Sequence, residues 1–147
     1  MRYNYLVMDY VKGTSLFDYC KKHGPLGEQV GHQYLMKILE FLQYLDNEGI
    51  SHRDLKLENI LLDKDKNIKV IDFDFAEKNT QRNSLQYAGT NIYSAPELLL
   101  KQKHDRRKAE MYCVGVMLYI MVVGAYPFWL ASVNNDKIFS NFTDKPI

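Results

Sequence analysis

The pattern of apolar and polar positions predicts a long amphipathic helix in the first third of the chain. Over residues 28–48 the apolar side chains recur every three or four positions, and Gly49 follows as a C-terminal cap. A shorter helix is predicted over residues 16–23, because a Gly-Pro pair follows it and stops helical continuation. Residues 16–48 are therefore predicted to be mainly helical.

Shorter apolar runs predict strands on either side of these helices. Residues 3–11 are apolar and aromatic with β-branched members, and a Lys-Gly pair follows them, so we predict a strand and a turn. The runs 60–62 and 68–71 flank a polar segment and predict a β-hairpin. Residues 77–86 are polar without periodicity, which predicts a mobile loop of the length that usually carries function. A short helix is predicted after this loop, over residues 96–100.

No charged residue falls within the segment 111–135, which is long enough to cross a bilayer. Gly124 and Pro127 interrupt it and leave about 13 apolar residues, a length more typical of a buried helix in a soluble core. We therefore expect a basic turn over residues 104–108, a buried helix over 109–123 and no membrane contact. A transmembrane helix is the alternative interpretation.

Composition narrows the class of protein further. The 147 residues are 46% hydrophobic and 25% charged, which is ordinary for a soluble globular domain or a large piece of one. With 19 basic and 18 acidic residues the net charge is +1, so no overall field attracts nucleic acid or an anionic membrane. Cys20 and Cys113 are too far apart in sequence to form a metal-ligand pair, and the first residues lack a signal-peptide pattern. We therefore expect reduced thiols and a cytoplasmic protein.

Residues 52–59 place an acid, a cation and an amide in one short segment between the long helix and the hairpin. Asp54 can accept or orient the proton of a hydroxyl nucleophile, and Lys56 can neutralise phosphate charge. Asn59 and Asp72 supply oxygen ligands that suit Mg²⁺. This set is typical of phosphoryl transfer, where catalysis is mostly positioning and electrostatic stabilisation. Each residue alone is more often a cap or a solvated charge, so the prediction depends on their joint spacing.

Three motifs, in this order, resemble those of the eukaryotic protein kinase family: His52-Arg53-Asp54 with Asn59, Asp72-Phe73, and Ala95-Pro96-Glu97. The resemblance covers nearly the whole chain. It implies an α+β fold, namely a mainly α-helical C-terminal lobe with a small β-hairpin at the catalytic loop, truncated here. Residues 1–13 would be the hinge strand and hinge, and residues 14–147 an incomplete C-terminal lobe.

The resemblance also implies a function, which is ATP-dependent transfer of phosphate to serine or threonine hydroxyls of a protein substrate. Asp54 would orient the hydroxyl and Lys56 would contact the transferred phosphoryl group. Asn59 and Asp72 would hold Mg²⁺. Lys56 and Thr90 are similar to residues of the serine/threonine-directed branch of the family.

The start of the chain resembles the part of a kinase that holds the adenine of ATP. Asp9 and Val11 look like the hinge whose backbone binds the base, and Leu61 looks like the apolar residue beneath the ring. The match begins at the hinge, so these residues include no Gly-rich phosphate loop, no strand lysine and no helix glutamate. We therefore expect a kinase fragment that is inactive alone.

Further matches resemble an activation segment and a loop that receives the substrate residue. Arg53 would be able to pair with phosphate on Ser84 or Thr80. Glu58 resembles an acidic position that favours basic peptide residues in some relatives. The residues that the resemblance assigns to this region are Arg53, Ser84, Gly89, Thr90 and Glu97.

Several positions depart from the family pattern. Asp74 stands where the metal-binding triplet has glycine, and its side chain restricts the backbone, so we expect reduced conformational switching. Glu110 replaces an aspartate that braces the catalytic loop, which keeps the charge with some loss of rigidity. Glu97 should lose the arginine partner that family members supply from later helices. Gln86 occupies a position that is commonly phosphorylated in the family, and glutamine cannot be phosphorylated.

Three functions compete. The first is a serine/threonine kinase, the second is a pseudokinase or kinase-like interaction module without turnover, and the third is a small-molecule phosphotransferase with a related lobe. The Ala95-Pro96-Glu97 motif and the Gly89-Thr90 loop suit a peptide-binding surface, which disfavours the third. The intact acid, lysine and metal ligands favour the first over the second.

Overall fold

The computed structural model of the chain describes residues 3, 5–78, 83–84 and 88–128. Its helices are α1 (Leu16–His23), α2 (Gly27–Asn47), α3 (Pro96–Leu99) and α4 (Arg106–Val123), and single 3₁₀ turns lie at Leu57–Asn59 and Asn91–Tyr93. Its strands are β1 (Thr14–Ser15), β2 (Ile50–Ser51), β3 (Ile60–Leu62), β4 (Ile68–Val70), β5 (Glu77–Lys78), β6 (Asn83–Ser84) and β7 (His104–Asp105). The fold is α+β and mainly α-helical, as predicted, with the predicted hairpin formed by β3 and β4.

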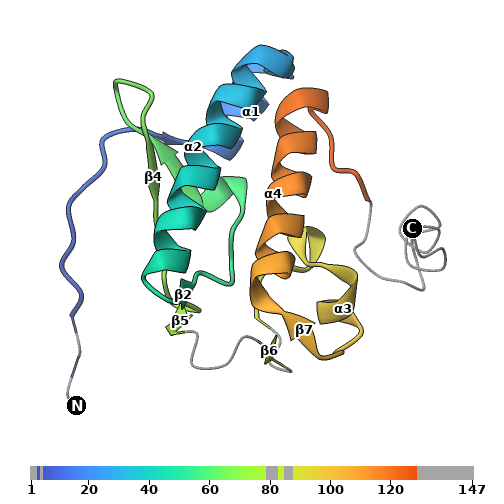
Figure 1. Ribbon diagram of the computed structural model, residues 1–147. Helices are drawn as coiled ribbons and strands as arrows, with labels where there is room; N and C mark the ends of the chain where they lie inside the picture. The colour runs from blue at the N-terminus through green and yellow to red at the C-terminus, as the bar shows by residue number, and fades with distance from the viewer. Residues whose placement is uncertain (1–2, 4, 79–82, 85–87, 129–147) are drawn as a thin grey trace.

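The two long helices, α2 and α4, lie side by side and build the core between them (Figure 1). They approach closely at Gly31, where a Cβ atom would lie 2.9 Å from Cγ2 of Val122. The core is completed by side chains from α1, the β2–β3 loop and β3. Its fully buried members include Leu16, Ile38, Leu55, Leu57, Ile60, Tyr93, Met117 and Met121.

Within the described residues, the strands form three small antiparallel sheets. The largest has the order β1-β3-β4, with Thr14 opposite Leu62 and Ile60 opposite Val70. Gly13 enters this sheet so closely that a Cβ atom would lie 1.8 Å from the Leu62 carbonyl oxygen, so only glycine fits there. The other two sheets pair β2 with β5 and β6 with β7. The β2–β5 pair brings the segment after Asp72 beside the loop that begins at residue 52.

Two polar segments contain described residues whose secondary structure the sequence does not predict. Residues 77–86 were expected to form a loop, but Glu77–Lys78 and Asn83–Ser84 are strands, because each pairs with a partner distant in sequence. The predicted basic turn over residues 104–108 is also wrong. The Asp105 carboxylate accepts from the backbone N–H groups of Arg107 at 3.0 Å and Lys108 at 3.5 Å, so it caps α4, which begins at Arg106.

The N-terminal segment is not the strand that residues 3–11 predict. Within its described residues, 3 and 5–13, no strand forms, and Figure 1 shows the segment as an extended trace to the left of β4. Tyr5, Val7 and Tyr10 are 84%, 92% and 88% exposed. A strand requires backbone partners as well as β-forming residues, and no described strand pairs with this segment.

Helix α4 ends where the sequence predicts. Gly124 adopts φ 76°, and its N–H donates to the Ile120 carbonyl at 2.9 Å. The segment from 129 to 135, part of the alternative membrane span, lies outside the described residues. Within the residues that are described, no helix has the length and apolar character needed to span a membrane.

Candidate active site

The loop between β2 and β3 carries most of the candidate side chains, and its backbone is locally strained. Arg53 adopts φ 70°, and Asp72, which lies across the loop, adopts φ 66°. These left-handed conformations are uncommon for residues with side chains, and they persist where surrounding contacts enforce them, often at functional sites. The strain therefore marks the residues directly around Asp54.

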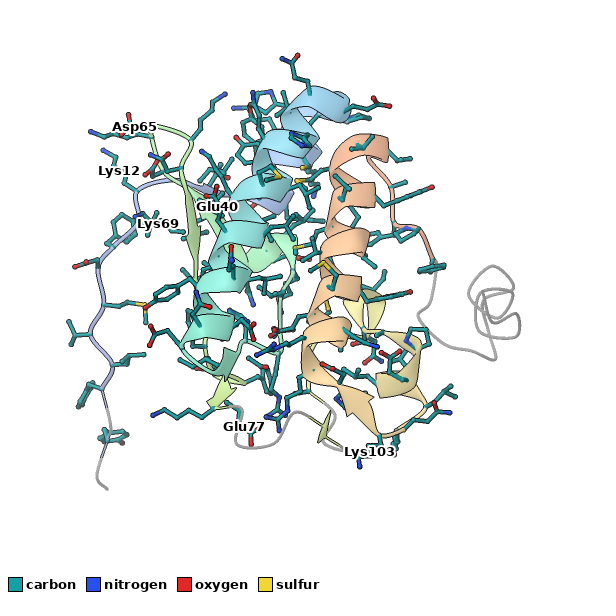
Figure 2. The ribbon with its side chains drawn as sticks, viewed as in Figure 1. Lys12, Glu40, Asp65, Lys69, Glu77 and Lys103 are labelled. Atoms are coloured by element: carbon teal, nitrogen blue, oxygen red, sulfur yellow. The ribbon has the colours of Figure 1, made fainter. Side chains whose placement is uncertain are left out.

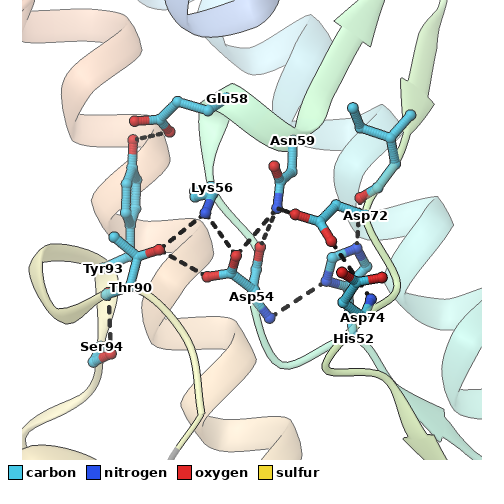
Figure 3. A network of polar contacts seen from close by, with 11 residues as sticks. His52, Asp54, Lys56, Glu58, Asn59, Asp72, Asp74, Thr90, Tyr93 and Ser94 are labelled. Carbon is cyan, nitrogen blue, oxygen red and sulfur yellow. Dashed lines mark hydrogen bonds and ion pairs between the residues drawn. The ribbon is translucent and has the colours of Figure 1, made fainter. Parts of the chain in front are cut away.

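Asp54 lies at the centre of a polar network (Figure 3). Its carboxylate is almost completely buried and receives a hydrogen bond on each oxygen. Lys56 Nζ donates to Oδ2 at 2.6 Å, and the Thr90 hydroxyl donates to Oδ1 at 2.8 Å. Lys56 Nζ also donates to Thr90 Oγ1 at 3.0 Å. A carboxylate, a cation and an aliphatic hydroxyl thus converge within hydrogen-bond distance.

Asn59 connects this network to Asp72. Its Nδ2 donates to the Asp54 carbonyl at 3.0 Å, lies 3.3 Å from Asp54 Oδ2 and reaches Asp72 Oδ2 at 3.5 Å. Because Nδ2 is engaged in this way, the amide oxygen is the atom of Asn59 suited to bind a cation. The donor set is therefore one amide oxygen and one carboxylate. This set fits Mg²⁺, which takes one or two protein ligands and completes its shell with phosphate oxygens and water.

A buried histidine holds the loop against the segment that carries Asp72. The Asp54 N–H donates to His52 Nδ1 at 3.3 Å, so Nε2 carries the proton and donates to the Ile71 carbonyl at 3.1 Å. Burial lowers the pKa of His52, which favours the neutral ring that this arrangement requires. The His52 ring also packs 4.7 Å from the Phe73 ring, between centroids.

Glu110 braces the same loop from α4. Its Oε1 accepts from the backbone N–H groups of His52 at 2.6 Å and Arg53 at 3.0 Å. Burial raises the pKa of this carboxyl, although the two N–H donors act in the opposite direction. The longer side chain that replaces the expected aspartate therefore still reaches both backbone donors.

The loop at Gly89-Thr90 meets the network from the other side. Gly89 adopts φ 108°, and a Cβ atom there would lie 2.6 Å from the Arg53 carbonyl oxygen, so glycine alone allows this approach. The buried Tyr93 hydroxyl donates to Glu58 Oε2 at 3.0 Å, and burial together with the Glu58 charge raises the pKa of Tyr93. Glu58 is thus held by Tyr93, and Figure 3 shows its carboxylate beside the Tyr93 hydroxyl.

Other predicted site residues lie apart from the network. Asp9 and Val11 belong to the extended N-terminal segment, and Leu61 is half-buried on β3. Ser84 is in β6, opposite His104, and its side chain lies outside what the structure describes. Glu97 is half-buried in the first turn of α3.

Sequence reasoning missed Glu77. It is the ion-pair partner of Arg53, and it also accepts from Arg106 Nη2 at 3.0 Å. No local sequence pattern predicts this cluster, because Arg53, Glu77 and Arg106 come from distant parts of the chain. The sequence signal available for Glu77 was its acidic side chain, five residues after Asp72.

Asp74, the departure from the metal-binding triplet, is exposed. It is not among the described non-glycine residues with positive φ, so this conformation does not need the freedom of glycine at that position. Its backbone N–H lies 3.5 Å from Asp72 Oδ1. The substitution therefore fits the conformation seen here, and the backbone restriction that it imposes bears on other conformations.

Comparison with known proteins places these features in a family. Residues 1–145 match the family model of the protein kinase domain. The chain is 41% identical over 134 residues to the serine/threonine-protein kinase kin-29 of Caenorhabditis elegans, covering 90% of this chain and 16% of the relative. It is 39% identical over 128 residues to CBL-interacting protein kinase 15 of Oryza sativa, covering 84% of this chain and 30% of the relative. It is also 39% identical over 130 residues to sperm motility kinase 3A of Mus musculus, covering 88% and 26%.

The chain therefore belongs to the protein kinase domain family. Among its relatives are proteins named as serine/threonine kinases. The match covers 16% to 30% of the length of the relatives compared above.

Proposed function

We propose that this chain is the catalytic-loop part of an ATP-dependent protein serine/threonine kinase. The observation that carries the proposal is the buried Asp54 carboxylate, which accepts an aliphatic hydroxyl on one oxygen and a lysine ammonium on the other. Residues 1–13 would be the hinge strand and hinge, and residues 14–147 an incomplete C-terminal lobe. Family membership supports ATP as the phosphate donor and a protein as the substrate.

In the proposed reaction, a serine or threonine hydroxyl of the substrate binds Asp54 Oδ1, where the Thr90 hydroxyl lies now. The bond from this hydroxyl oxygen to the γ-phosphorus forms, the bond from that phosphorus to the leaving oxygen of ADP breaks, and Asp54 takes the hydroxyl proton. Lys56 stabilises negative charge on the transferred group. Asn59 and Asp72 would hold Mg²⁺, which neutralises phosphate charge when bound.

Several other assignments stay predictions of the same proposal. Asp9, Val11 and Leu61 would contact the adenine, and Glu58, held by Tyr93, would favour a basic residue in the peptide. A cytoplasmic location and the absence of nucleic-acid and membrane partners also stay predictions.

The proposal can be tested with a lobe-restored chain, meaning these 147 residues joined to the N-terminal lobe of an active serine/threonine kinase. We expect this protein to phosphorylate a serine or threonine peptide and to leave the matched tyrosine peptide unmodified, because Lys56 and Thr90 enclose Asp54 closely. Mass spectrometry of the three peptides after equal incubation with ATP and Mg²⁺ measures this. Phosphorylation of tyrosine alone would contradict the assignment, and a folded chain without any transfer would favour the interaction module.

A further prediction concerns Asp74→Gly in the lobe-restored chain. Glycine relieves a backbone restriction worth ~0.7 kcal/mol, so we expect turnover to rise about threefold with the Mg²⁺ dependence unchanged. Titration of activity against Mg²⁺ for both proteins measures both quantities, and Asp65→Gly, on the exposed hairpin turn, is the matched control. A clear loss of apparent Mg²⁺ affinity in Asp74→Gly would instead place Asp74 in the metal shell.

A further inference from the structure

Glu77 joins three distant parts of the chain through its carboxylate. Oε2 of Glu77 is paired with Arg53 Nη1 from the β2–β3 loop and with Arg106 Nη2, at 3.0 Å, from the first turn of α4. Figure 2 shows Glu77 at the lower end of the molecule, where β5 lies beside β2. The proposed phosphoryl-transfer chemistry uses none of these three side chains directly.

The two arginine partners of Glu77 are more deeply buried than Glu77 itself, whose side chain is 37% exposed. The Arg53 side chain is 16% exposed and the Arg106 side chain is 9% exposed, so both guanidinium groups are largely removed from water. A largely buried charge that loses its partner destabilises the folded state strongly. Glu110, the other acidic group near Arg106, is engaged by two backbone N–H groups of the catalytic loop. Glu77 is therefore the acidic side chain that the described structure pairs with both arginines.

The backbone places Glu77 in register with the catalytic loop. Ser51 lies opposite Glu77 in the β2–β5 pair. Because Ser51 precedes Arg53 by two residues, this pairing holds the Glu77 backbone close to the start of the catalytic loop. Arg53 has the left-handed φ of 70° and directly precedes Asp54. A contact that fixes the Arg53 side chain therefore also constrains the backbone from which the Asp54 carboxylate projects.

We propose that Glu77 is a positioning residue that pairs with Arg53 and Arg106 and thereby holds Asp54 in place. The chain supplies this anion from its own sequence, so Arg53 is neutralised without phosphate on Ser84 or Thr80. The kinetic consequence rests on the proposed kinase function, whereas the structural consequence does not.

The first test is thermal unfolding of the 147-residue chain with Glu77→Gln, which removes the charge and keeps the shape. We expect the melting temperature to fall by about 5 °C or more, since two largely buried cations lose the carboxylate that they share. Glu40→Gln, on the exposed face of α2, is the matched control and should leave it unchanged (Figure 2). Sodium sulfate, compared with sodium chloride at equal ionic strength, should raise the melting temperature of Glu77→Gln more than that of the wild type, because sulfate can occupy the vacated anion position. Equal melting temperatures, or an equal response to sulfate, would overturn the proposal.

A double-mutant cycle keeps the test decisive if Glu77→Gln alone does not fold. In an Arg53→Gln background, Glu77→Gln should lower the free energy of unfolding by less than half of the amount by which it lowers that of the wild type. A double variant that is folded when Glu77→Gln is not also supports the pairing, and full additivity or an unfolded double variant contradicts it.

The kinetic test uses the lobe-restored chain. Glu77→Gln should lower kcat about 10-fold while KM for ATP changes less than about twofold, because Asp54 is misplaced and the nucleotide site is not. Sulfate should restore part of kcat at a temperature well below the melting transition of the variant, where the protein is already folded and general stabilisation by sulfate cannot raise turnover. If the lobe-restored wild type has no turnover, the proposed function fails, and the melting and sulfate results still decide the role of Glu77. An unchanged kcat in Glu77→Gln overturns the positioning role of Glu77.

Discussion

The lobe-restored chain with Asp54→Asn is expected to lose phosphoryl transfer by about 10²–10⁴-fold, the usual contribution of a positioned general base. Asparagine keeps the shape of the side chain and the acceptor that faces Thr90. It loses the negative charge that binds Lys56 and that takes or orients the proton of the substrate hydroxyl. Its amide nitrogen would also face the Lys56 ammonium. The loss should therefore appear in kcat, with KM for ATP nearly unchanged.

Steady-state phosphorylation of a serine peptide measures this effect. Asp65→Asn is the matched control, because Asp65 lies on the exposed β3–β4 turn, away from the network (Figure 2). Circular dichroism of both variants separates loss of catalysis from loss of fold. Turnover of Asp54→Asn within threefold of the wild type would remove Asp54 from the catalytic role.

Removal of the Glu110 side chain is expected to have the largest effect on stability. In Glu110→Ala, the backbone N–H groups of His52 and Arg53 lose the oxygen that accepts both of them. Each buried donor left unsatisfied costs about 1–3 kcal/mol, so we expect the free energy of unfolding to fall by about 3 kcal/mol. Urea denaturation of the 147-residue chain measures it, with Glu40→Ala on the exposed face of α2 as control.

The Glu110→Gln variant tests the charge separately from the hydrogen bonds. Glutamine keeps an oxygen that can accept both N–H groups, so it should be less destabilising than alanine. Because burial raises the pKa of Glu110, the unfolded carboxyl ionises first as the pH rises above 4.5. The stability of the wild type relative to the Glu110→Gln variant should therefore be greatest below that pH and decline as the pH rises through the folded pKa. An alanine variant within 1 kcal/mol of the wild type, or an advantage of glutamate that grows with pH, would contradict this account.

The elements that the sequence predicts well are those whose pattern is local. The helix over residues 28–48 and the hairpin at Ile60–Leu62 and Ile68–Val70 are confirmed, because spacing along one segment determines them. The strand expected over residues 3–11 is wrong, since a strand depends on a partner that its own sequence does not contain. The short strands β5 and β6 were missed for the converse reason: their polar residues are strands only through pairing with β2 and β7.

The residues of the candidate site also divide into those that local spacing predicts and those that depend on distant parts of the chain. The motif spacing identified Asp54, Lys56, Asn59 and Asp72, and the structure brings their side chains together. The position of Glu110 predicted a brace for the catalytic loop, and the structure shows both hydrogen bonds. Glu77 could not be found, because its partner Arg53 lies 24 residues away and the pairing depends on the β2–β5 register.

The central claim is that this site transfers phosphate from ATP to a hydroxyl of a protein. The most direct measurement is incorporation of the γ-phosphate into a serine peptide by the lobe-restored chain, with the parent kinase of the added lobe as the positive control. The account predicts Mg²⁺-dependent phosphoserine that disappears in Asp54→Asn. No phosphoserine from a folded lobe-restored chain, under conditions where the parent kinase is active, would contradict the claim and leave a kinase-like module without turnover.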